Sequence, residues 1–174
     1  SSAAMSEAVK SGLRWWPLGV VAIALDQATK EWILRTFALH ESHYVLPVFD
    51  IVHARNYGAA FSFLDFPGGM QRWLFTVFAL AVSAGILWWV RRLDASAQKL
   101  QAAGLMLIAS GALGNVIDRI RHGNVVDFIA VHWGNAYFPA FNVADSCITI
   151  GAGLVLLDAL LESRREARAG RGQP

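Results

Sequence analysis

The chain has 174 residues, of which 55% are hydrophobic and only 16% are charged, with a net charge of +2 and a pI near 9.0. This apolar composition is unusual for a soluble globular protein and favours a single membrane domain. The basic residues are scattered among apolar stretches rather than gathered on one face, so the positive charge does not indicate a nucleic-acid partner.

The first predicted element is a membrane-spanning helix from Trp15 to Leu34. A hydrocarbon core of about 30 Å requires roughly 20 largely apolar residues in a helix. A cleaved signal peptide is an alternative, but Asp26 interrupts the apolar stretch and three further spans follow, so we expect a retained helix. Residues 1–4 have the character of a tag remnant, and we expect residues 5–174 to form one domain.

Asp26 and Lys30 are ionisable residues within this first span, where such side chains are costly and mark function. They lie one helical turn apart on the same face, so they can neutralise each other. We expect an orienting ion pair that holds a loop or a neighbouring helix. A catalytic role is the less favoured alternative.

An outward segment of about residues 35–72 follows the first span. Residues 44–63 are rich in Val, Ile, Phe and Tyr, with Pro47, Asp50 and Gly58 as breaks. This pattern predicts short strands joined by turns.

The second and third predicted spans run from Trp73 to Val90 and from about Gln101 to Ile120. The third is rich in small residues, which permit close approach between membrane helices. These residues are Ala102, Ala103, Gly104, Ala109, Ser110, Gly111, Ala112 and Gly114. We therefore expect this helix at the centre of the bundle.

Polar residues end the third span, namely Asn115, Asp118 and Arg119. Asn115 and Arg119 share one helical face. The arginine can bind backbone or carboxylate groups near the outer surface. The sequence leaves a structural role and a substrate-binding role for it equally open.

A second outward segment covers about residues 121–140. Residues 125–133 and 136–138 flank Gly134-Asn135, a dipeptide suited to a tight hairpin. With the strands of the first outward segment, this hairpin predicts a small extracytoplasmic β-sheet over the helix ends.

The fourth predicted span runs from Phe141 to Leu161 and contains Cys147, the only cysteine. A lone cysteine cannot form an intrachain disulfide, and we expect it to pack as a small apolar residue. Asp158, near the inner end, is expected to reach water beside the arginines that follow. The polar, Arg-rich tail after Glu162 is expected to be mobile.

Basic residues set the orientation of the chain, because short loops rich in Lys and Arg stay in the cytoplasm. They precede the first span, separate the second from the third, and follow the fourth: Lys10, Arg14, Arg91, Arg92, Lys99, Arg164, Arg165, Arg168 and Arg171. Both chain ends are therefore predicted to be cytoplasmic. The predicted fold is a membrane all-α, four-transmembrane-helix bundle with a small extracytoplasmic β-sheet.

Two aspartates, Asp127 and Asp145, are predicted at the outer membrane surface, one after the third span and one in the first turns of the fourth. If they meet, repulsion in a poorly solvated site prevents both from ionising, so they share one proton. Such a pair can activate a water and protonate a departing amine, as peptide hydrolysis requires. From spacing alone, two unrelated aspartates in capping positions are equally compatible with the sequence.

Five blocks of sequence, in order, resemble the bacterial lipoprotein signal peptidases, also called signal peptidase II. They are Leu25-Asp26-Gln27-Ala28-Thr29-Lys30, Asn56-Tyr57-Gly58-Ala59-Ala60-Phe61-Ser62, Gly111-Ala112-Leu113-Gly114-Asn115 with Asp118-Arg119, Val125-Val126-Asp127-Phe128, and Phe141-Asn142-Val143-Ala144-Asp145-Ser146. They span nearly the whole chain in the family's order.

This resemblance implies an aspartyl endopeptidase that removes the signal peptide of a prolipoprotein on the amino side of its diacylglyceryl-modified cysteine. The family's catalytic aspartates fall on Asp127 and Asp145. Its substrate-binding or supporting residues fall on Asp26, Lys30, Asn56, Gly58, Asn115, Arg119 and Asn142. Tyr57 departs from the family, which more often carries a small hydroxyl residue there.

The resemblance also implies the setting of the enzyme. We expect a multi-pass protein of the bacterial inner membrane with its active site on the periplasmic side. The expected partners are diacylglyceryl-prolipoproteins, membrane lipids and inhibitory cyclic peptides of the globomycin type, with no nucleic acid and no cofactor. Nothing in the sequence requires more than a monomer.

Three other functions are alternatives to a peptidase of this kind. A small proton-coupled transporter would use intramembrane carboxylates, but it predicts acidic residues spread across the membrane depth. Here the key pair, Asp127 and Asp145, is predicted at one face of the membrane. A metal-dependent peptidase would use aspartates and His132 as ligands, but the sequence lacks H-E-x-x-H or a comparable ligand cluster, and the histidines are expected at the protein surface or the membrane interface. A non-enzymatic scaffold would leave the polar residues unexplained.

Overall fold

The computed structural model describes residues 10–58 and 68–171. The tag remnant expected at residues 1–4, and the part of the family-like motif at residues 59–62, lie outside this described part of the chain.

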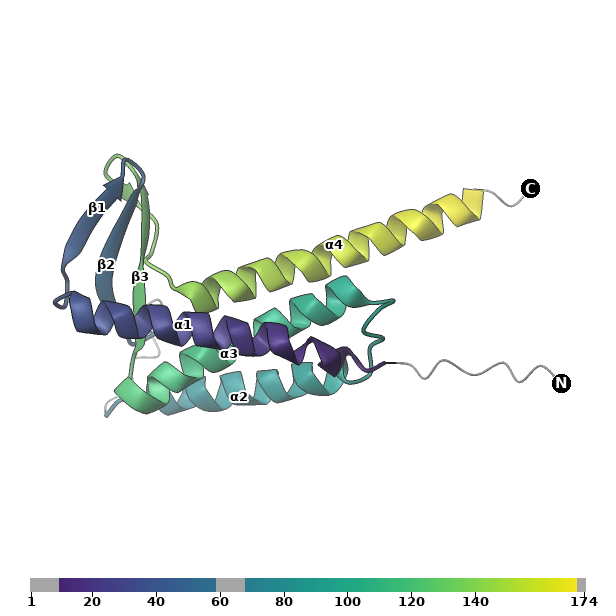
Figure 1. Cartoon of the computed structure of the whole chain (residues 1–174), viewed down its shortest axis with the longest axis horizontal. Coiled ribbons are helices and arrows are strands. Elements are labelled where there is room, and N and C mark those ends of the chain that lie inside the picture. Colours follow the sequence, from purple (N-terminus) through teal and green to yellow (C-terminus); the bar gives the residue numbers. More distant parts are fainter. Residues whose placement is uncertain (1–9, 59–67, 172–174) are drawn as a thin grey trace.

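Four α-helices and one short 3-10 helix lie in the described residues. They are η1 (Gly12–Trp15), α1 (Trp16–Thr36), α2 (Met70–Val90), α3 (Lys99–His122) and α4 (Val143–Arg171). Each predicted span therefore has a helix, with ends shifted by one to three residues at most boundaries. Figure 1 shows the helices running side by side, with the sheet at one end of the bundle.

The end of α4 differs from its prediction. The predicted fourth span ends at Leu161, but α4 continues as a helix to Arg171 and projects beyond the other helices (Figure 1), while the mobility expected after Glu162 stays a prediction. The physical reason is local, because Glu, Arg and Ala dominate this segment and are strong helix formers. A polar composition alone does not prevent a helix.

Three helices, α2, α3 and α4, are long and apolar enough to cross a membrane. The helix α1 has 21 residues, which suffices in length, but it carries Asp26, Lys30, Glu31 and Arg35. The structure therefore shows a membrane protein with three candidate spans and a small antiparallel sheet. A fourth span formed by α1 remains a prediction.

The helix α3 is the central helix of the bundle, as its small residues predicted. It contacts α1, α2 and α4. Within its most apolar stretch 61% of the residues are buried, against 17% in α2 and in α4. The outer helices therefore leave apolar side chains exposed on the surface of the bundle, where a lipid-facing protein needs them.

Glycines make this close packing possible. A Cβ added to Gly104 would lie 2.7 Å from the carbonyl oxygen of Gly151, and one added to Gly114 would lie 2.5 Å from a carboxylate oxygen of Asp26. At these two positions α3 approaches α4 and α1 more closely than any larger residue would allow.

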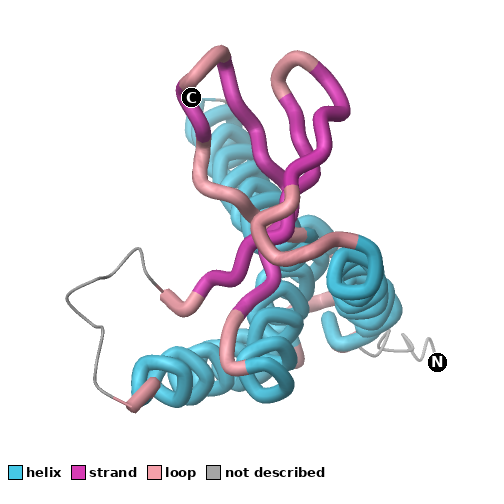
Figure 2. The backbone as a smooth tube through the Cα atoms, turned by 90° about the vertical axis from the view of Figure 1, so that its left-hand side faces the viewer, coloured by secondary structure: helices cyan, strands magenta, loops and turns pink. Residues whose placement is uncertain are grey.

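The sheet has four antiparallel strands in chain order, β1 (Ser42–Leu46), β2 (Phe49–Asn56), β3 (Val125–Trp133) and β4 (Ala136–Tyr137). Gly134, with φ at +56°, makes the turn between β3 and β4. Viewed along the bundle, the strands cross over the helix ends (Figure 2). The two hydrophobic stretches thus form the small sheet that they predicted, and its extracytoplasmic side remains a prediction.

Two details of the sheet correct the sequence interpretation. Asp50 is not a break, because it lies inside β2, is buried, and has Oδ2 3.3 Å from Nε2 of His132. His53 is also buried rather than on the surface, and its Nδ1 lies 2.9 Å from the carbonyl oxygen of Phe37. Both residues are enclosed because β2 packs between β1 and β3 next to the end of α1.

Candidate functional site

Asp127 and Asp145 reach the same region from different elements. Asp127 lies near the start of β3 and is only 4% exposed. Asp145 lies in the first turn of α4, where it forms a capping box with Asn142. The Asn142 side-chain oxygen accepts from the Asp145 N–H at 2.9 Å, and an Asp145 carboxylate oxygen accepts from the Asn142 N–H at 3.2 Å.

Asn142 joins the two aspartates. Its side-chain amide nitrogen donates to Oδ1 of Asp127 at 2.8 Å, its side-chain oxygen accepts from the Asp145 N–H, and its backbone N–H donates to the Asp145 carboxylate. Asn142 itself is fully buried. The same residue that begins α4 therefore holds both carboxyl groups near one point.

The pKa of Asp127 is raised to about 7. Burial is the largest cause, because it disfavours the charged form, and the negative charge of Asp145 is the next. Hydrogen bonds from Asn56 and Asn142 and the charge of Lys30 oppose the rise. At neutral pH a carboxyl group in this state exchanges a proton readily, as a general acid or base must.

Beneath the two aspartates lies a set of three buried charges, which we call the buried ion cluster (Asp26, Lys30 and Asp118). Lys30 Nζ lies 2.9 Å from Asp26 Oδ2 and 3.0 Å from Asp118 Oδ2. All three side chains are at most 2% exposed. The ion pair expected between Asp26 and Lys30 is therefore present, and Asp118 extends it from α1 to α3.

Asn115 connects the buried ion cluster to the aspartate pair. Its side-chain oxygen accepts from Lys30 Nζ at 3.0 Å, and its amide donates to Asp145 Oδ1 at 3.0 Å. Asn142 also donates to the Asn115 oxygen, at 3.2 Å. Charged and neutral groups thus form one continuous hydrogen-bonded network inside the bundle.

Arg119 and the Asn56 loop complete the set of residues that the sequence singled out. The half-buried guanidinium of Arg119 lies over the Phe75 ring at 5.5 Å and interacts electrostatically with both Asp145 and Asp127. Asn56 accepts from the Gly58 N–H at 2.8 Å. Gly58 has φ at +89°, and an added Cβ would lie 2.5 Å from the Phe75 ring, so only glycine fits.

An apolar groove opens beside Asp145. It has a volume of about 470 Å³ and is lined by Phe138, Phe141, Asp145, Ser146, Thr149 and Ile150. One carboxyl group of the pair therefore borders a space that an apolar ligand can enter.

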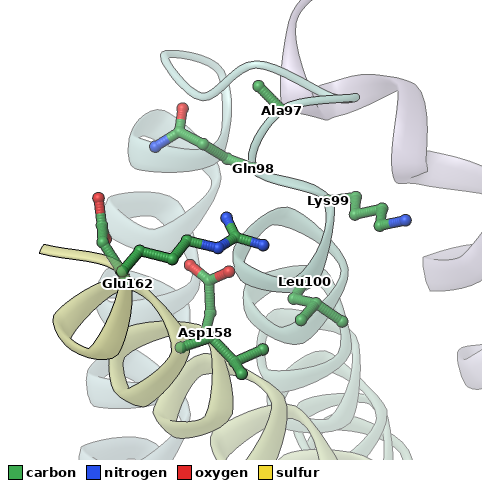
Figure 3. Close-up of a pocket in the computed structure, with 8 residues that line it drawn as sticks. Ala97, Gln98, Lys99, Leu100, Asp158 and Glu162 are labelled. Atoms are coloured by element: carbon green, nitrogen blue, oxygen red, sulfur yellow. The ribbon is translucent and has the colours of Figure 1, made fainter. Parts of the chain in front are cut away.

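A smaller pocket of about 140 Å³ lies at the opposite end of α4. Figure 3 shows Asp158 and Glu162 of α4 on one side of this pocket, with Ala97 and Gln98, which precede α3, and Leu100, in its first turn, on the other. Asp158 is thus remote from Asp127 and Asp145, near the arginines that follow it, as the sequence suggested.

Two residues of the network were missed as site residues from the sequence. Asp118 accepts from the Val126 N–H at 3.0 Å, and Gln27 donates to both Asp118 and Asp26 at 3.1 Å. Their position on α3 and α1 was visible, but the packing that brings these helices together was not. Within residues 10–58 and 68–171, no group of three or more His, Cys, Asp or Glu side chains is arranged to hold a metal ion.

Comparison with known proteins supports one family. Residues 18–161 match the family model described as signal peptidase (SPase) II. The lipoprotein signal peptidase of Shewanella baltica (strain OS155) is 49% identical over 162 residues, which cover 93% of this chain and 94% of that protein. That of Shewanella oneidensis is 49% identical over 156 residues, covering 90% and 91%.

Two solved structures, both described as bacterial membrane enzymes, share the fold. The first has a TM-score of 0.77 and 30% identity, with 88% of this chain and 98% of that chain covered. The second has a TM-score of 0.74 and 31% identity, with 86% and 89% covered.

Proposed function

The chain belongs to the signal peptidase II family, the lipoprotein signal peptidases, and from this premise we propose that Asp127 and Asp145 are the catalytic pair of an intramembrane aspartyl endopeptidase. Membership of the family makes the chain a membrane-bound aspartic protease that cleaves lipoprotein signal peptides. The residues that perform the reaction, and its steps, are the proposal.

The observation that carries the proposal is the link through Asn142. This side chain donates to Asp127 at 2.8 Å and forms a capping box with Asp145, so both carboxyl groups face one site. With its pKa near 7, Asp127 can hold the proton that a closely spaced pair shares.

In the proposed reaction the ionised carboxylate takes a proton from water while the water oxygen attacks the scissile carbonyl carbon. The protonated carboxyl group then gives its proton to the amide nitrogen as the C–N bond breaks. The departing amine is that of the lipidated cysteine, so the cleaved bond lies on its amino side. The pair finishes with one proton, as it began.

Substrate binding is assigned to the neighbouring residues. The positive charge of half-buried Arg119 is available to a substrate carbonyl or to a developing oxyanion near the pair. The Asn56–Gly58 turn would lie against the peptide backbone. The apolar groove beside Asp145 suits the lipid-modified residue, whose acyl chains stay in the bilayer.

The proposed substrates are diacylglyceryl-modified prolipoproteins, and globomycin-type cyclic peptides are the proposed inhibitors. The proposed orientation follows the distribution of Lys and Arg, with both termini in the cytoplasm and the aspartate pair at the periplasmic face of the inner membrane. We propose that the enzyme acts as a monomer among membrane lipids and without a metal. The proton-coupled transporter is set aside because the family is one of peptidases.

Single substitutions test the proposal. Asp127→Asn and Asp145→Asn should each abolish cleavage of a diacylglyceryl-modified precursor in detergent, because an amide can neither take up nor release the shared proton. Far-UV circular dichroism should show an unchanged helical content. Asp158→Asn is the matched control at the far end of α4 and should cleave normally.

Chelators should leave the activity of the unmodified enzyme unchanged. Cleavage by either aspartate variant would remove the aspartyl mechanism, and loss of activity on chelation would favour a metal-dependent one.

A further inference from the structure

The two carboxylates of the buried ion cluster make parallel contacts with the backbone of the aspartate pair. Asp118 Oδ2 accepts a hydrogen bond from the N–H of Val126 at 3.0 Å, and Val126 directly precedes Asp127. Asp26 Oδ1 accepts from the N–H of Ala144 at 2.8 Å, and Ala144 directly precedes Asp145. Each carboxylate thus holds the main chain one residue before a proposed catalytic aspartate.

Lys30 ties these two attachments together. Its single ammonium group lies 2.9 Å from Asp26 and 3.0 Å from Asp118. Gln27 forms a second, uncharged connection, since its side-chain amide donates to both carboxylates at 3.1 Å. The distance between the two backbone contacts is therefore fixed by two independent cross-links.

The backbone contacts of Asp118 and Asp26 lie next to Asp127 and Asp145, so they influence how the two carboxyl groups are oriented. Asp127 lies on a strand and Asp145 lies on a helix, and these elements are joined by a connection that runs through the short strand β4. Asp26 comes from α1 and Asp118 from α3, so these two contacts join the aspartates to segments that are far from them in the sequence or in another element. Charge-assisted hydrogen bonds are about twice as strong as neutral ones, which makes them effective anchors.

We propose that Asp118 and Asp26, linked through Lys30, are positioning residues that set the separation of the catalytic carboxyl groups of Asp127 and Asp145. Asp118 fixes β3 and so Asp127, whereas Asp26 fixes the first turn of α4 and so Asp145. The proposal rests on the function proposed above for the aspartate pair. A displacement of about 1 Å in such a site costs about 100-fold in rate.

Two substitutions at Asp118 test whether its effect depends on accepting the hydrogen bond from Val126. Both remove the negative charge and keep a side chain of similar size. Asp118→Asn keeps an oxygen that can accept from Val126 and face Lys30, while its amide nitrogen replaces the oxygen that accepts from Gln27. Asp118→Leu has a similar size but removes the acceptor. Asp158→Leu, which makes the same exchange at the far end of α4, controls for the loss of a carboxylate from a helix.

The leucine variant should lose about 100-fold in kcat, with KM changed by less than about threefold, because substrate contacts are preserved. The asparagine variant should keep kcat within about tenfold, since it loses about one hydrogen bond, the one from Gln27, and keeps the acceptor for Val126. The Asp158→Leu control should match the unmodified enzyme.

The pH dependence of kcat separates a displacement of the aspartates from a smaller fraction of folded enzyme. Asp127 faces Asp145 from α4, Lys30 from α1 and Arg119 from α3, and repulsion from Asp145 is one cause of its raised pKa. If Asp118→Leu lets the two aspartates move apart, that repulsion weakens and the alkaline limb of kcat shifts to lower pH. A loss of folded enzyme would lower the whole profile without displacing the limb.

Wild-type kcat and an unmoved alkaline limb in a folded Asp118→Leu variant would overturn the proposal. If that variant does not fold, the folded Asp118→Asn variant decides, because retention of kcat within about tenfold supports positioning through the acceptor and a larger loss contradicts it. These results are distinct from failure of the proposed function, which would appear as cleavage by Asp127→Asn or Asp145→Asn.

Discussion

Asn142 holds Asp127 by a hydrogen bond of 2.8 Å from its side-chain amide, and the same Asn142 is the N-cap of α4. The start of this helix and the orientation of the Asp127 carboxyl group, which we propose to be catalytic, therefore depend on one side chain. The amide also reaches the carbonyl oxygen of Val126 at 3.2 Å. Loss of Asn142 thus affects the helix, the strand and the site together.

We expect Asn142→Ala to lower both stability and activity. Loss of the N-cap costs about 0.5–2 kcal/mol in general. The unfolding temperature in detergent should fall, and kcat should drop because Asp127 loses an orienting donor. Asn142→Asp should recover much of the cap but not the activity, since a third carboxylate would stand beside Asp127.

Asn135→Ala is the control for this prediction, because Asn135 lies in the exposed β3–β4 turn. It should leave activity unchanged. Full activity in Asn142→Asp would contradict the role assigned to the amide, as would an unchanged unfolding temperature in Asn142→Ala.

Activity should fall as the pH rises above about 7. The pKa of Asp127 is raised from 3.8 to about 7, so its proton is present below that pH and is lost above it. Because hydrolysis requires one proton on the pair, the alkaline limb of kcat should lie near pH 7. A profile that stays flat to pH 9 would exclude Asp127 as the residue that holds this proton.

The same raised pKa predicts a dependence of stability on pH. The folded protein binds the Asp127 proton more tightly than the unfolded chain does. This contribution favours folding below pH 3.8 and is lost as the pH rises from 3.8 through about 7. Thermal unfolding at pH 5 and pH 8 should therefore differ less in Asp127→Asn than in the unmodified enzyme.

The sequence predicted what depends on local pattern. Apolar windows located the helices, Gly134-Asn135 located the β3–β4 turn, and the spacing of Asp26 and Lys30 placed them on one face. Each of these features needs only neighbouring residues.

Features that depend on contacts between distant segments were missed. Asp118 becomes part of the network because α1 packs on α3, and its partners Lys30 and Val126 come from other elements. Asp50 and His53 were placed wrongly because their burial depends on how β2 packs in the sheet and against the end of α1. The hydropathy pattern of the sequence does not predict these contacts between distant segments.

Lys30→Met should strongly destabilise the protein. Removal of one partner from a buried ion pair costs about 3–5 kcal/mol, because a buried charge is left uncompensated. Here both Asp26 and Asp118 would lose their cation. The unfolding temperature in detergent should fall by many degrees.

Arg35→Met on the same helix is the matched control. Arg35 Nε lies 2.8 Å from a carboxylate oxygen of Glu31, but the arginine side chain is 77% exposed. Exposed pairs of this kind contribute little to stability. Equal effects of the two substitutions would mean that the buried ion cluster does not stabilise the fold.

The contact between α3 and the start of α4 can be tested at Gly111. A Cβ at this position would collide with the carbonyl oxygen of Ala144 and would lie 2.8 Å from Ile148 Cγ1. Gly111→Ala should push the first turn of α4 outward and move Asp145, with a cost of about 1–3 kcal/mol from overpacking. Both kcat and the unfolding temperature should decrease.

Gly153→Ala supplies the comparison within the same pair of helices. A Cβ at Gly153 meets nothing within 4 Å, and alanine is the better helix former by about 1 kcal/mol. This variant should cleave normally and should be at least as stable as the unmodified enzyme. If Gly111→Ala also cleaves normally, the close approach of α3 to Ala144 does not determine where Asp145 lies, and the geometry of the pair depends on the hydrogen bonds alone.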